Sequence, residues 1–292
     1  MVIYKRSLLV SNILDPLTHT NEDLKNIYRR LSYLDDYESI ETRLIKDNEM
    51  IDYFNQVVGQ KFELTYWITG EIQRAKLNLS SVNEEKRIAS VELVKSMIKI
   101  AVKTNCQWIG LASGCIESTV EEGLIAFQKS ISDLLLEIEN QKYQISIILE
   151  PLDQFAHKCN VIGTLDTTLQ LLRSIPERFL NHKRLSICFD TAHVALNDDN
   201  FETTFQKLAP YISRVHFANA VLNKQSPMYG DYHLPLCQEG FLNLELAREV
   251  RKFIELYLTG EITVTMEVRE TQREHAWVLE KEMKEFLNEV LR

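Results

Sequence analysis

Residues 185–217 read LSICFDTAHVALNDDNFETTFQKLAPYISRVHF and contain two β-rich runs on either side of a helical segment. The runs, Leu185–Phe189 and Ile212–Phe217, are short, apolar and partly β-branched. Between them, Phe201–Leu208 places apolar residues at three- and four-residue spacing, which is the spacing of one helix face. A strand, a helix and a second strand in this order predict a βαβ unit with parallel strands.

The same alternation continues along the whole chain. The β-rich runs are Tyr4–Val10, Ser39–Leu44, Lys61–Trp67, Gln107–Ala112, Gln144–Leu149, Leu185–Phe189, Ile212–Phe217 and Ile262–Met266. Eight strands, each followed by a helix, predict an α/β protein with a single (β/α)₈ TIM barrel spanning residues 1–292. A doubly wound open sheet is the alternative. It would normally have a glycine-rich turn after an early strand, where this chain has Ser11-Asn12-Ile13.

The clearest helical segment is Glu84–Val102. Its apolar spacing predicts one buried face, made of Ile88, Val91, Val94, Met97, Ile98 and Ala101.

Composition agrees with one core of ordinary size and limits the class of function. Hydrophobic residues make up 45% and charged residues 26% of the chain, and only 9 Gly and 6 Pro leave little sequence for linkers. The formal net charge is −9, and Lys and Arg form no basic stripe along the sequence. This disfavours a nucleic-acid substrate, because such a surface usually needs clustered positive charge.

The cysteines and the apolar runs indicate the compartment. The five cysteines include no CxxC pair, and an odd number argues against a disulfide framework. The apolar run Leu8–Val10 ends at Ser11, too early for a signal peptide. No run approaches the roughly 18–20 apolar residues of a membrane span. We therefore expect a cytoplasmic protein without a membrane segment, and the sequence leaves a homo-oligomer open.

Metal-binding residue types end four consecutive predicted strands. In a (β/α)₈ barrel, catalytic residues lie at the carboxyl ends of the strands. At these ends the chain has Glu150, Asp190, His216 and Glu267. Three carboxylates and an imidazole suit a divalent ion such as Mn²⁺, Zn²⁺, Mg²⁺ or Co²⁺, and the carboxylates would repel one another without a cation. Each residue taken alone could be a helix cap, a loop ion pair or a core histidine, but four on successive strands favour a metal site.

Three further polar residues lie near these positions. His193 follows Asp190 by three residues, so that one helical turn can bring both side chains to the same side. Asp231 and His233 lie in the loop after the seventh strand. They could be ligands of a second metal ion, substrate contacts or a solvated loop.

The strand-end segments resemble those of the xylose isomerase-like TIM barrels, a superfamily that includes sugar isomerases, sugar epimerases and endonuclease IV. The resemblance rests on Leu149-Glu150-Pro151-Leu152, Phe189-Asp190-Thr191-Ala192-His193, Val215-His216-Phe217-Ala218-Asn219, Gly230-Asp231-Tyr232-His233-Leu234-Pro235 and Met266-Glu267. It implies that Glu150, Asp190, His216 and Glu267 bind one divalent metal ion. In the epimerase branch it also implies that Glu150 and Glu267 act as an acid–base pair and that His193 contacts a substrate oxygen.

The sequence departs from both branches of the superfamily. Endonuclease IV has histidines after strands three and four, where this chain has Thr65-Tyr66-Trp67 and Leu111-Ala112-Ser113-Gly114-Cys115. Ketose epimerases commonly have an arginine six residues after the strand-seven histidine, where Leu222 stands. Substrate contacts could come instead from other strand-end residues, namely Glu41 and Arg43, Trp67, or the favoured pair His157 and Lys158.

The resemblance favours a metal-dependent isomerase or epimerase that acts on a sugar or a related keto or polyol compound. Proton transfer would proceed through a metal-stabilised enediolate. Two alternatives use the same ligands: a phosphodiester hydrolase similar to endonuclease IV, and a dehydratase. A non-enzymatic barrel that binds a sugar or a metal is a further alternative, because a fold does not imply a function.

Overall fold

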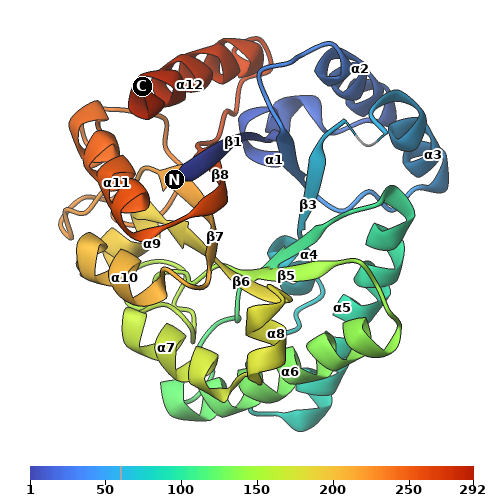
Figure 1. Cartoon of the computed structure of the whole chain (residues 1–292), viewed down its shortest axis with the longest axis vertical. Coiled ribbons are helices and arrows are strands. Elements are labelled where there is room, and N and C mark those ends of the chain that lie inside the picture. The colour runs from blue at the N-terminus through green and yellow to red at the C-terminus, as the bar shows by residue number, and fades with distance from the viewer. Residues whose placement is uncertain (60) are drawn as a thin grey trace.

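The computed structural model describes residues 1–59 and 61–292, which form a closed barrel of eight parallel strands (Figure 1). The strands are β1 (Val2–Leu9), β2 (Ser39–Thr42), β3 (Glu63–Trp67), β4 (Trp108–Leu111), β5 (Ser146–Leu149), β6 (Leu185–Asp190), β7 (Ile212–Ala218) and β8 (Gly260–Glu267). Each strand pairs with the next along the chain, and β8 pairs with β1 to close the sheet. The predicted (β/α)₈ barrel is therefore confirmed.

The strand boundaries differ from the predicted ones by at most two residues. The differences at the carboxyl ends matter for the site. The sixth strand runs one residue further than predicted and ends at Asp190, and the eighth does the same and ends at Glu267. Both carboxylates are thus held by strand pairing, in register with β7, rather than by a loop.

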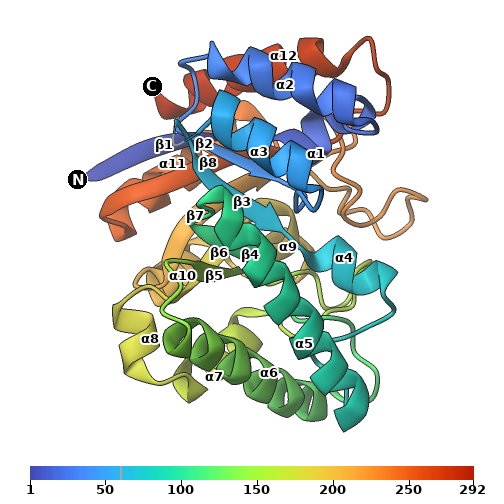
Figure 2. The ribbon, with the colours of Figure 1, turned by 90° about the vertical axis from the view of Figure 1, so that its right-hand side faces the viewer.

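In the described part of the chain, eight helices of eight or more residues surround the barrel (Figure 1; Figure 2). They are α2 (Asn21–Ser32), α3 (Asn48–Val57), α5 (Glu84–Ala101), α6 (Val120–Asn140), α7 (Leu165–Ser174), α10 (Phe201–Leu208), α11 (Leu244–Tyr257) and α12 (Ala276–Leu291). All but α12 begin after a Thr, Asp or Asn whose side chain accepts a hydrogen bond from a backbone N–H of the first turn. Such caps satisfy donors that the helix itself leaves unpaired.

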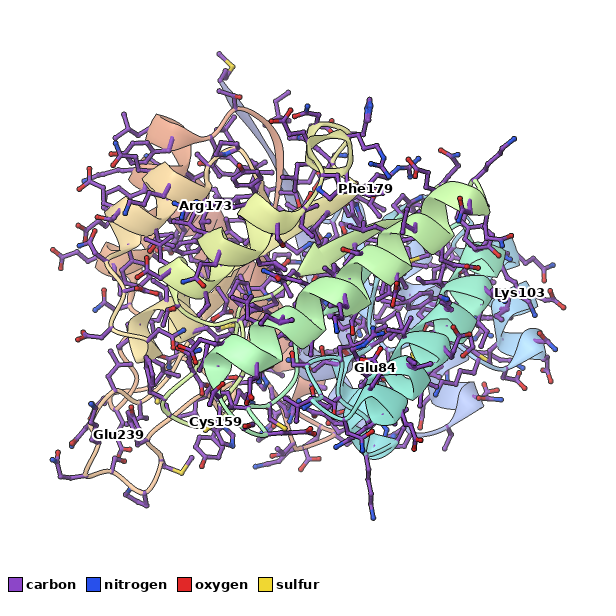
Figure 3. The ribbon with its side chains drawn as sticks, turned by 90° about the horizontal axis from the view of Figure 1, so that it is seen from below. Glu84, Lys103, Cys159, Arg173, Phe179 and Glu239 are labelled. Atoms are coloured by element: carbon purple, nitrogen blue, oxygen red, sulfur yellow. The ribbon has the colours of Figure 1, made fainter. Side chains whose placement is uncertain are left out.

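The buried face of α5 differs from the prediction at one position. Val91, Val94, Met97, Ile98 and Ala101 are buried as expected, but Ile88 is 48% exposed. The inward position in this turn belongs to Arg87, which forms ion pairs with Glu84 and with Asp133 of α6 at 2.7 and 3.0 Å. Helices α5 and α6 lie side by side in Figure 3. The charged contact between them therefore displaces Ile88 from the packed face.

Six short helices were not predicted, because they are too short to show a periodic apolar pattern. They are α1 (Val10–Ile13), α4 (Thr69–Arg74), α8 (Glu177–Asn181), α9 (Thr191–Leu196) and the 3₁₀ helices η1 (Asp15–Leu17) and η2 (Val102–Thr104). Of these, α1 and α9 directly follow the carboxyl ends of β1 and β6, and α4 begins two residues after the end of β3. Among the described residues, no helix is long and apolar enough to cross a membrane.

The barrel interior is unusually polar near its carboxyl end. In most such barrels, branched apolar side chains fill the interior. Here the interior also holds Glu41 of β2 and both Arg214 and His216 of β7, each at most 1% exposed. Charged groups at this depth need partners, and His216 finds its partners among the acidic residues at the carboxyl end of the barrel.

Candidate metal centre and active site

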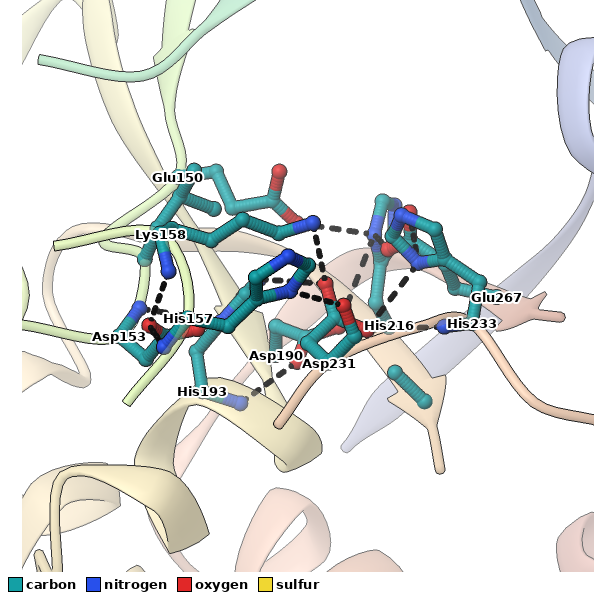
Figure 4. A network of polar contacts seen from close by, with 12 residues as sticks. Glu150, Asp153, His157, Lys158, Asp190, His193, His216, Asp231, His233 and Glu267 are labelled. Carbon is teal, nitrogen blue, oxygen red and sulfur yellow. Dashed lines mark hydrogen bonds and ion pairs between the residues drawn. The ribbon is translucent and has the colours of Figure 1, made fainter. Parts of the chain in front are cut away.

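Four buried side chains from neighbouring strands meet at the carboxyl end of the barrel (Figure 4). Glu150 directly follows β5, Asp190 ends β6, His216 lies in β7 and Glu267 ends β8. Each offers a ligand atom, and these four atoms lie within 4.8 Å of one another. The structure thus brings together the four residues that the sequence placed at successive strand ends.

One imidazole nitrogen lies at the centre of this group. The Nδ1 atom of His216 is 2.6 Å from Oε2 of Glu267, 3.2 Å from Oε1 of Glu150 and 4.0 Å from Oδ2 of Asp190. The other oxygen of Glu267 accepts a hydrogen bond from Nδ2 of Asn12 at 3.2 Å. Asn12 lies in α1, just after β1, and sequence reasoning did not identify it as a site residue.

The donor set fits a divalent cation. Among the described protein atoms, Oε1 of Glu150 and Oδ2 of Asp190 are buried without a hydrogen-bond partner. Buried acceptors without partners are costly, and a cation held between them would satisfy both. Carboxylate oxygens and an imidazole nitrogen are ligands that Mn²⁺, Zn²⁺, Mg²⁺ and Co²⁺ accept, although they do not select one of these ions.

The pKa values of the buried carboxylates also indicate a site for a cation. Burial raises the pKa of Asp190 well above its usual value, and the charges of Glu267 and Glu150 add to this while His193 opposes it. Burial alone would also raise the pKa of Glu267, but the charges of His216 and His233 lower it to about 2. Burial and the neighbouring carboxylates therefore disfavour the ionised form of Asp190, and a bound cation would offset both effects.

A second polar group adjoins the first and surrounds Asp231. Its Oδ2 atom lies 3.3 Å from Nζ of Lys158 and 3.7 Å from Nε2 of His193. The Nδ1 atom of His193 accepts a hydrogen bond from the backbone N–H of Asp153 at 3.1 Å. The Nδ1 atom of His157 lies 2.7 Å from the carbonyl oxygen of Asp231. This group ties the loops after β5 and β7 together (Figure 4).

His193 and Asp231 carry strongly shifted pKa values. Burial would lower the pKa of His193, but the carboxylates of Asp190, Asp153 and Asp231 raise it to about 10. Burial would raise the pKa of Asp231, but the charges of His233, His193 and Lys158 lower it well below its usual range. Nε2 of His193 and Oδ2 of Asp231 lie 3.7 Å apart at the base of the cavity.

His233 links the two groups. Its Nδ1 atom lies 3.3 Å from Oδ1 of Asp231 and 3.4 Å from Oε1 of Glu267. Its backbone φ of +54° is uncommon for a residue other than glycine. Gly230 precedes this segment with φ of +126°, and a Cβ atom there would lie 2.9 Å from Cβ of His157. The loop therefore needs glycine at position 230 to approach His157 so closely.

These residues line one cavity of about 620 Å³. Glu150 and Glu267 lie at its base with His193 and Asp231, and its wall includes Trp67, His157, Lys158, His233, Arg43 and Arg269. Asp190 and His216 are below this lining. A depression of similar size between α11 and α12 is lined mainly by Arg248, Arg251, Lys252 and Arg292, and no candidate metal group of the described residues lies there.

Glu41 was suggested as a substrate contact, and this is wrong. The side chain is 0% exposed and does not belong to the cavity lining. It accepts hydrogen bonds from Nε1 of Trp67 at 2.6 Å and from Nε2 of His216 at 3.1 Å. Its other oxygen contacts Nη1 of Arg214 at 2.5 Å and the hydroxyl group of Thr265. Glu41 does not reach the cavity because its side chain points from β2 into the barrel interior, below the site.

Arg214 and Asp153 were also missed by sequence reasoning. Arg214 stands two residues before His216 on the same strand, and side chains two apart in a strand lie on the same face. That spacing was the available signal that Arg214 points inward. Asp153 lies in the loop after Glu150, and nothing in its local pattern marks it as the fully buried partner of His193.

The strand order defines a (β/α)₈ barrel, and the buried polar residues lie at its carboxyl end. Similarity to known proteins shows which family of barrels it belongs to. A model of the xylose isomerase-like TIM barrel matches residues 36–284, and the chain belongs to this family. No curated protein matches the sequence.

Solved structures agree on the fold. The chain is similar to a D-tagatose 3-epimerase-like protein, with 22% identity over 98% of each chain and a TM-score of 0.69. It is also similar to an IolI protein with a bound zinc atom, with 14% identity over 98% of this chain and 97% of that one and a TM-score of 0.70. A family 2 AP endonuclease from Brucella melitensis matches with 15% identity over 95% and 98% and a TM-score of 0.62.

Proposed function

We propose that the protein is a metal-dependent isomerase or epimerase of a sugar or a related keto or polyol compound. The observation that carries the proposal is the pair of glutamates at the base of the cavity. Glu150 and Glu267 reach it from β5 and β8, on either side of His216 Nδ1, and both have carboxylate oxygens in the candidate metal group. The likeness to a D-tagatose 3-epimerase-like structure supports this reaction class.

In this proposal Glu150, Asp190, His216 and Glu267 hold one divalent ion. When bound, such an ion supplies Lewis-acid polarisation of a substrate carbonyl. The zinc atom of the similar IolI structure supports a bound metal in this proposal. Asp231 and His233 are proposed as supports for Lys158, His193 and Glu267 rather than as ligands of a second ion, because their atoms join neither candidate metal group.

The two glutamates supply the acid and the base. One carboxylate removes the proton from the carbon next to the substrate carbonyl, which gives an enediolate. The other glutamate returns a proton from the opposite side for epimerisation, or the same one returns it to the neighbouring carbon for isomerisation. Oε1 of Glu150 lies 3.2 Å from Nδ1 of His216 but has no hydrogen-bond partner among the described residues, so no hydrogen bond has to break before it takes a proton.

The remaining cavity residues bind and shield the substrate. His193 and Lys158 are proposed to contact substrate oxygens, and His157 lies beside them against Asp231. Trp67 packs edge-on against His216, with ring centroids 5.3 Å apart, and forms an apolar wall over the ligand group. Such a wall excludes water from the reacting carbon.

The test is hydrogen exchange with solvent. The metal content of the purified protein is measured first, and a panel of ketoses, aldoses and keto-polyols is then incubated in D₂O with that metal. An isomerase or epimerase incorporates deuterium at the carbon next to the carbonyl, which NMR detects even where the equilibrium favours the starting sugar. Glu150→Gln should lose this exchange, while Glu92→Gln on the exposed side of α5 should keep it. A metal-loaded protein that exchanges no C–H bond in the panel would contradict the proposal.

Phosphodiester hydrolysis is the second candidate function. It is favoured by Asp231, His193 and His233 beside the four ligands and by the similarity to the AP endonuclease structure. It is disfavoured by the net charge of −9 and by the segments after β3 and β4, which carry no histidine. Incision of a duplex with an abasic site by metal-loaded protein, absent in Asp190→Asn, would reverse the ranking. Loss of water from a substrate in the sugar panel would instead identify a dehydratase.

The protein is further proposed to act in the cytoplasm. All five cysteines are free thiols in the structure, as expected for a reducing compartment.

A further inference from the structure

A buried carboxylate contacts the candidate metal centre from below. Glu41 on β2 is 0% exposed, and its Oε2 atom accepts hydrogen bonds from Nε2 of His216 and Nε1 of Trp67. His216 therefore contacts Glu41 with one ring nitrogen and the carboxylates of Glu150 and Glu267 with the other. The ring lies between two acidic groups that come from opposite directions.

The other oxygen of Glu41 is held by positive charge. Nη1 of Arg214 lies 2.5 Å from Oε1, and the guanidinium also donates to Oγ1 of Thr65 at 2.9 Å. Replacing a buried ion pair with apolar residues is often neutral or even stabilising. In a barrel interior that branched apolar side chains could fill, stability alone does not account for Glu41 and Arg214.

The hydrogen-bond donors around Glu41 fix the proton on His216. The indole Nε1 of Trp67 can only donate to Oε2, and the positive charge of Arg214 beside Oε1 keeps Glu41 ionised, so Glu41 acts as an acceptor. Nε2 of His216 must then carry the proton in its contact with Oε2. In the neutral ring, this leaves the lone pair on Nδ1, the atom that faces Glu150, Asp190 and Glu267.

We propose that Glu41 is a positioning residue that holds His216 as the Nε2–H tautomer and aims Nδ1 at the metal, while the same carboxylate oxygen fixes Trp67 as the cavity wall. This inference rests on the proposed metal site and deepens it. Carboxylates that accept the second N–H of a metal-bound histidine orient the ring and raise its basicity, and losing them typically weakens metal binding 10–100-fold.

The variants are chosen so that neither leaves a buried charge unpaired. Glu41→Met/Arg214→Met removes the acceptor and the ion pair together. Glu41→Gln/Arg214→Met removes the same charges but keeps an amide oxygen at position 41. The difference between these two variants isolates the acceptor for His216. Glu280→Gln is the matched control, because Glu280 of α12 is also a buried carboxylate, but it accepts a hydrogen bond from Tyr37, which precedes β2, and it does not line the cavity.

The first measurement is the dissociation constant for Zn²⁺, determined by competition with a chelator. The Glu41→Met/Arg214→Met protein should bind Zn²⁺ 10–100-fold more weakly than the parent. Glu41→Gln/Arg214→Met should recover part of the loss, and Glu280→Gln should match the parent. Parent-like affinity in the Glu41→Met/Arg214→Met protein would overturn the proposal. So would equal losses in both double variants, since they would point to a general structural effect.

The second measurement is a ¹⁵N–¹H spectrum of the imidazole groups, which reads the tautomer directly. In zinc-loaded parent protein, we expect His216 to show Nε2–H with Nδ1 bound to zinc, and a proton on Nδ1 would overturn the inference. If the parent binds no metal, the proposed function fails, but the hydrogen bond is still tested. The Nε2 proton of metal-free parent should exchange slowly with water and should exchange rapidly in Glu41→Met/Arg214→Met. Equal exchange rates in these two proteins would reject the role of Glu41.

Discussion

The Nδ1 atom of His216 lies 2.6 Å from Oε2 of Glu267, and Oε1 of Glu150 approaches the same nitrogen to 3.2 Å. One imidazole nitrogen thus lies between the two carboxylates that we propose as acid and base. Because β7 is paired with β8, the positions of His216 and Glu267 are built into the sheet, and Glu150 directly follows β5. The chemistry of the site can therefore be tested with substitutions that leave the backbone in place.

Glu150→Gln should lower kcat by a factor of about 10²–10⁴, the usual contribution of a general acid or base. The amide keeps the size of the side chain and one oxygen, and Asp190, His216 and Glu267 still hold the metal. We therefore expect metal content to fall only partly while turnover is lost. Steady-state kinetics on the best substrate of the panel, with elemental analysis of the same sample, check this. A Glu150→Gln enzyme that turns over at the parent rate would remove Glu150 from the chemistry.

Asp190→Asn should separate metal binding from folding. Asp190 is both a candidate ligand and the N-cap of α9, where its side chain accepts from the backbone N–H of His193 at 2.9 Å. Asparagine caps helices as well as aspartate does, so the helix should stay intact. For the parent, a metal at 100 times its Kd should stabilise the fold by about 2.7 kcal/mol, and a chelator should reverse this. Thermal unfolding with and without metal should show no such difference for Asp190→Asn, and a parent-like metal response would argue against Asp190 as a ligand.

Local sequence patterns were sufficient for the barrel and for the strand-end residues. Strand alternation and helix spacing depend on neighbouring residues, and the carboxyl ends of parallel strands meet at one end of a barrel. The role of Glu41 could not be predicted from local patterns. Its contact with His216 joins residues 175 positions apart, and only the closed barrel determines that its side chain points inward. The predicted burial of Ile88 was wrong for a related reason, because Arg87 forms ion pairs with Glu84 of its own helix and with Asp133 of α6 and takes the inward position.

Lys158→Met should weaken substrate binding with little effect on the chemical step. Its Nζ atom lies at the cavity wall, 3.3 Å from Oδ2 of Asp231, and its side chain is 23% exposed. A contact that is equally strong in the ground state and the transition state changes KM and leaves kcat unchanged. A lost hydrogen bond to a charged group should raise KM about tenfold or more. Lys95→Met serves as a matched control, since its side chain is 22% exposed and pairs with Glu92 on α5, and an unchanged KM for Lys158→Met would place the substrate elsewhere in the cavity.

Alkaline pH should destabilise the fold through three buried tyrosines. Burial raises the pKa of Tyr28, Tyr37 and Tyr66, and the charge of Glu280, which accepts the Tyr37 hydrogen bond at 2.6 Å, adds to the shift of Tyr37. A pKa that is higher in the folded state gives stability that is complete below the unfolded value of about 10 and is lost as the pH rises above it. Each such tyrosine should lower the free energy of unfolding by about 1.4 kcal/mol per pH unit above about pH 10.

Urea unfolding between pH 8 and pH 11 measures this slope, and absorbance at 295 nm should show that these phenols ionise only as the protein unfolds. Tyr37→Phe should make the slope shallower by about one proton, although it also lowers stability at neutral pH because Glu280 loses a buried donor. Tyr33→Phe is the control, since Tyr33 is 79% exposed and should leave the slope unchanged. If Tyr37→Phe and the parent lose stability with the same slope, the Tyr37 phenol titrates as freely as an exposed one and the hydrogen bond to Glu280 does not hold its proton.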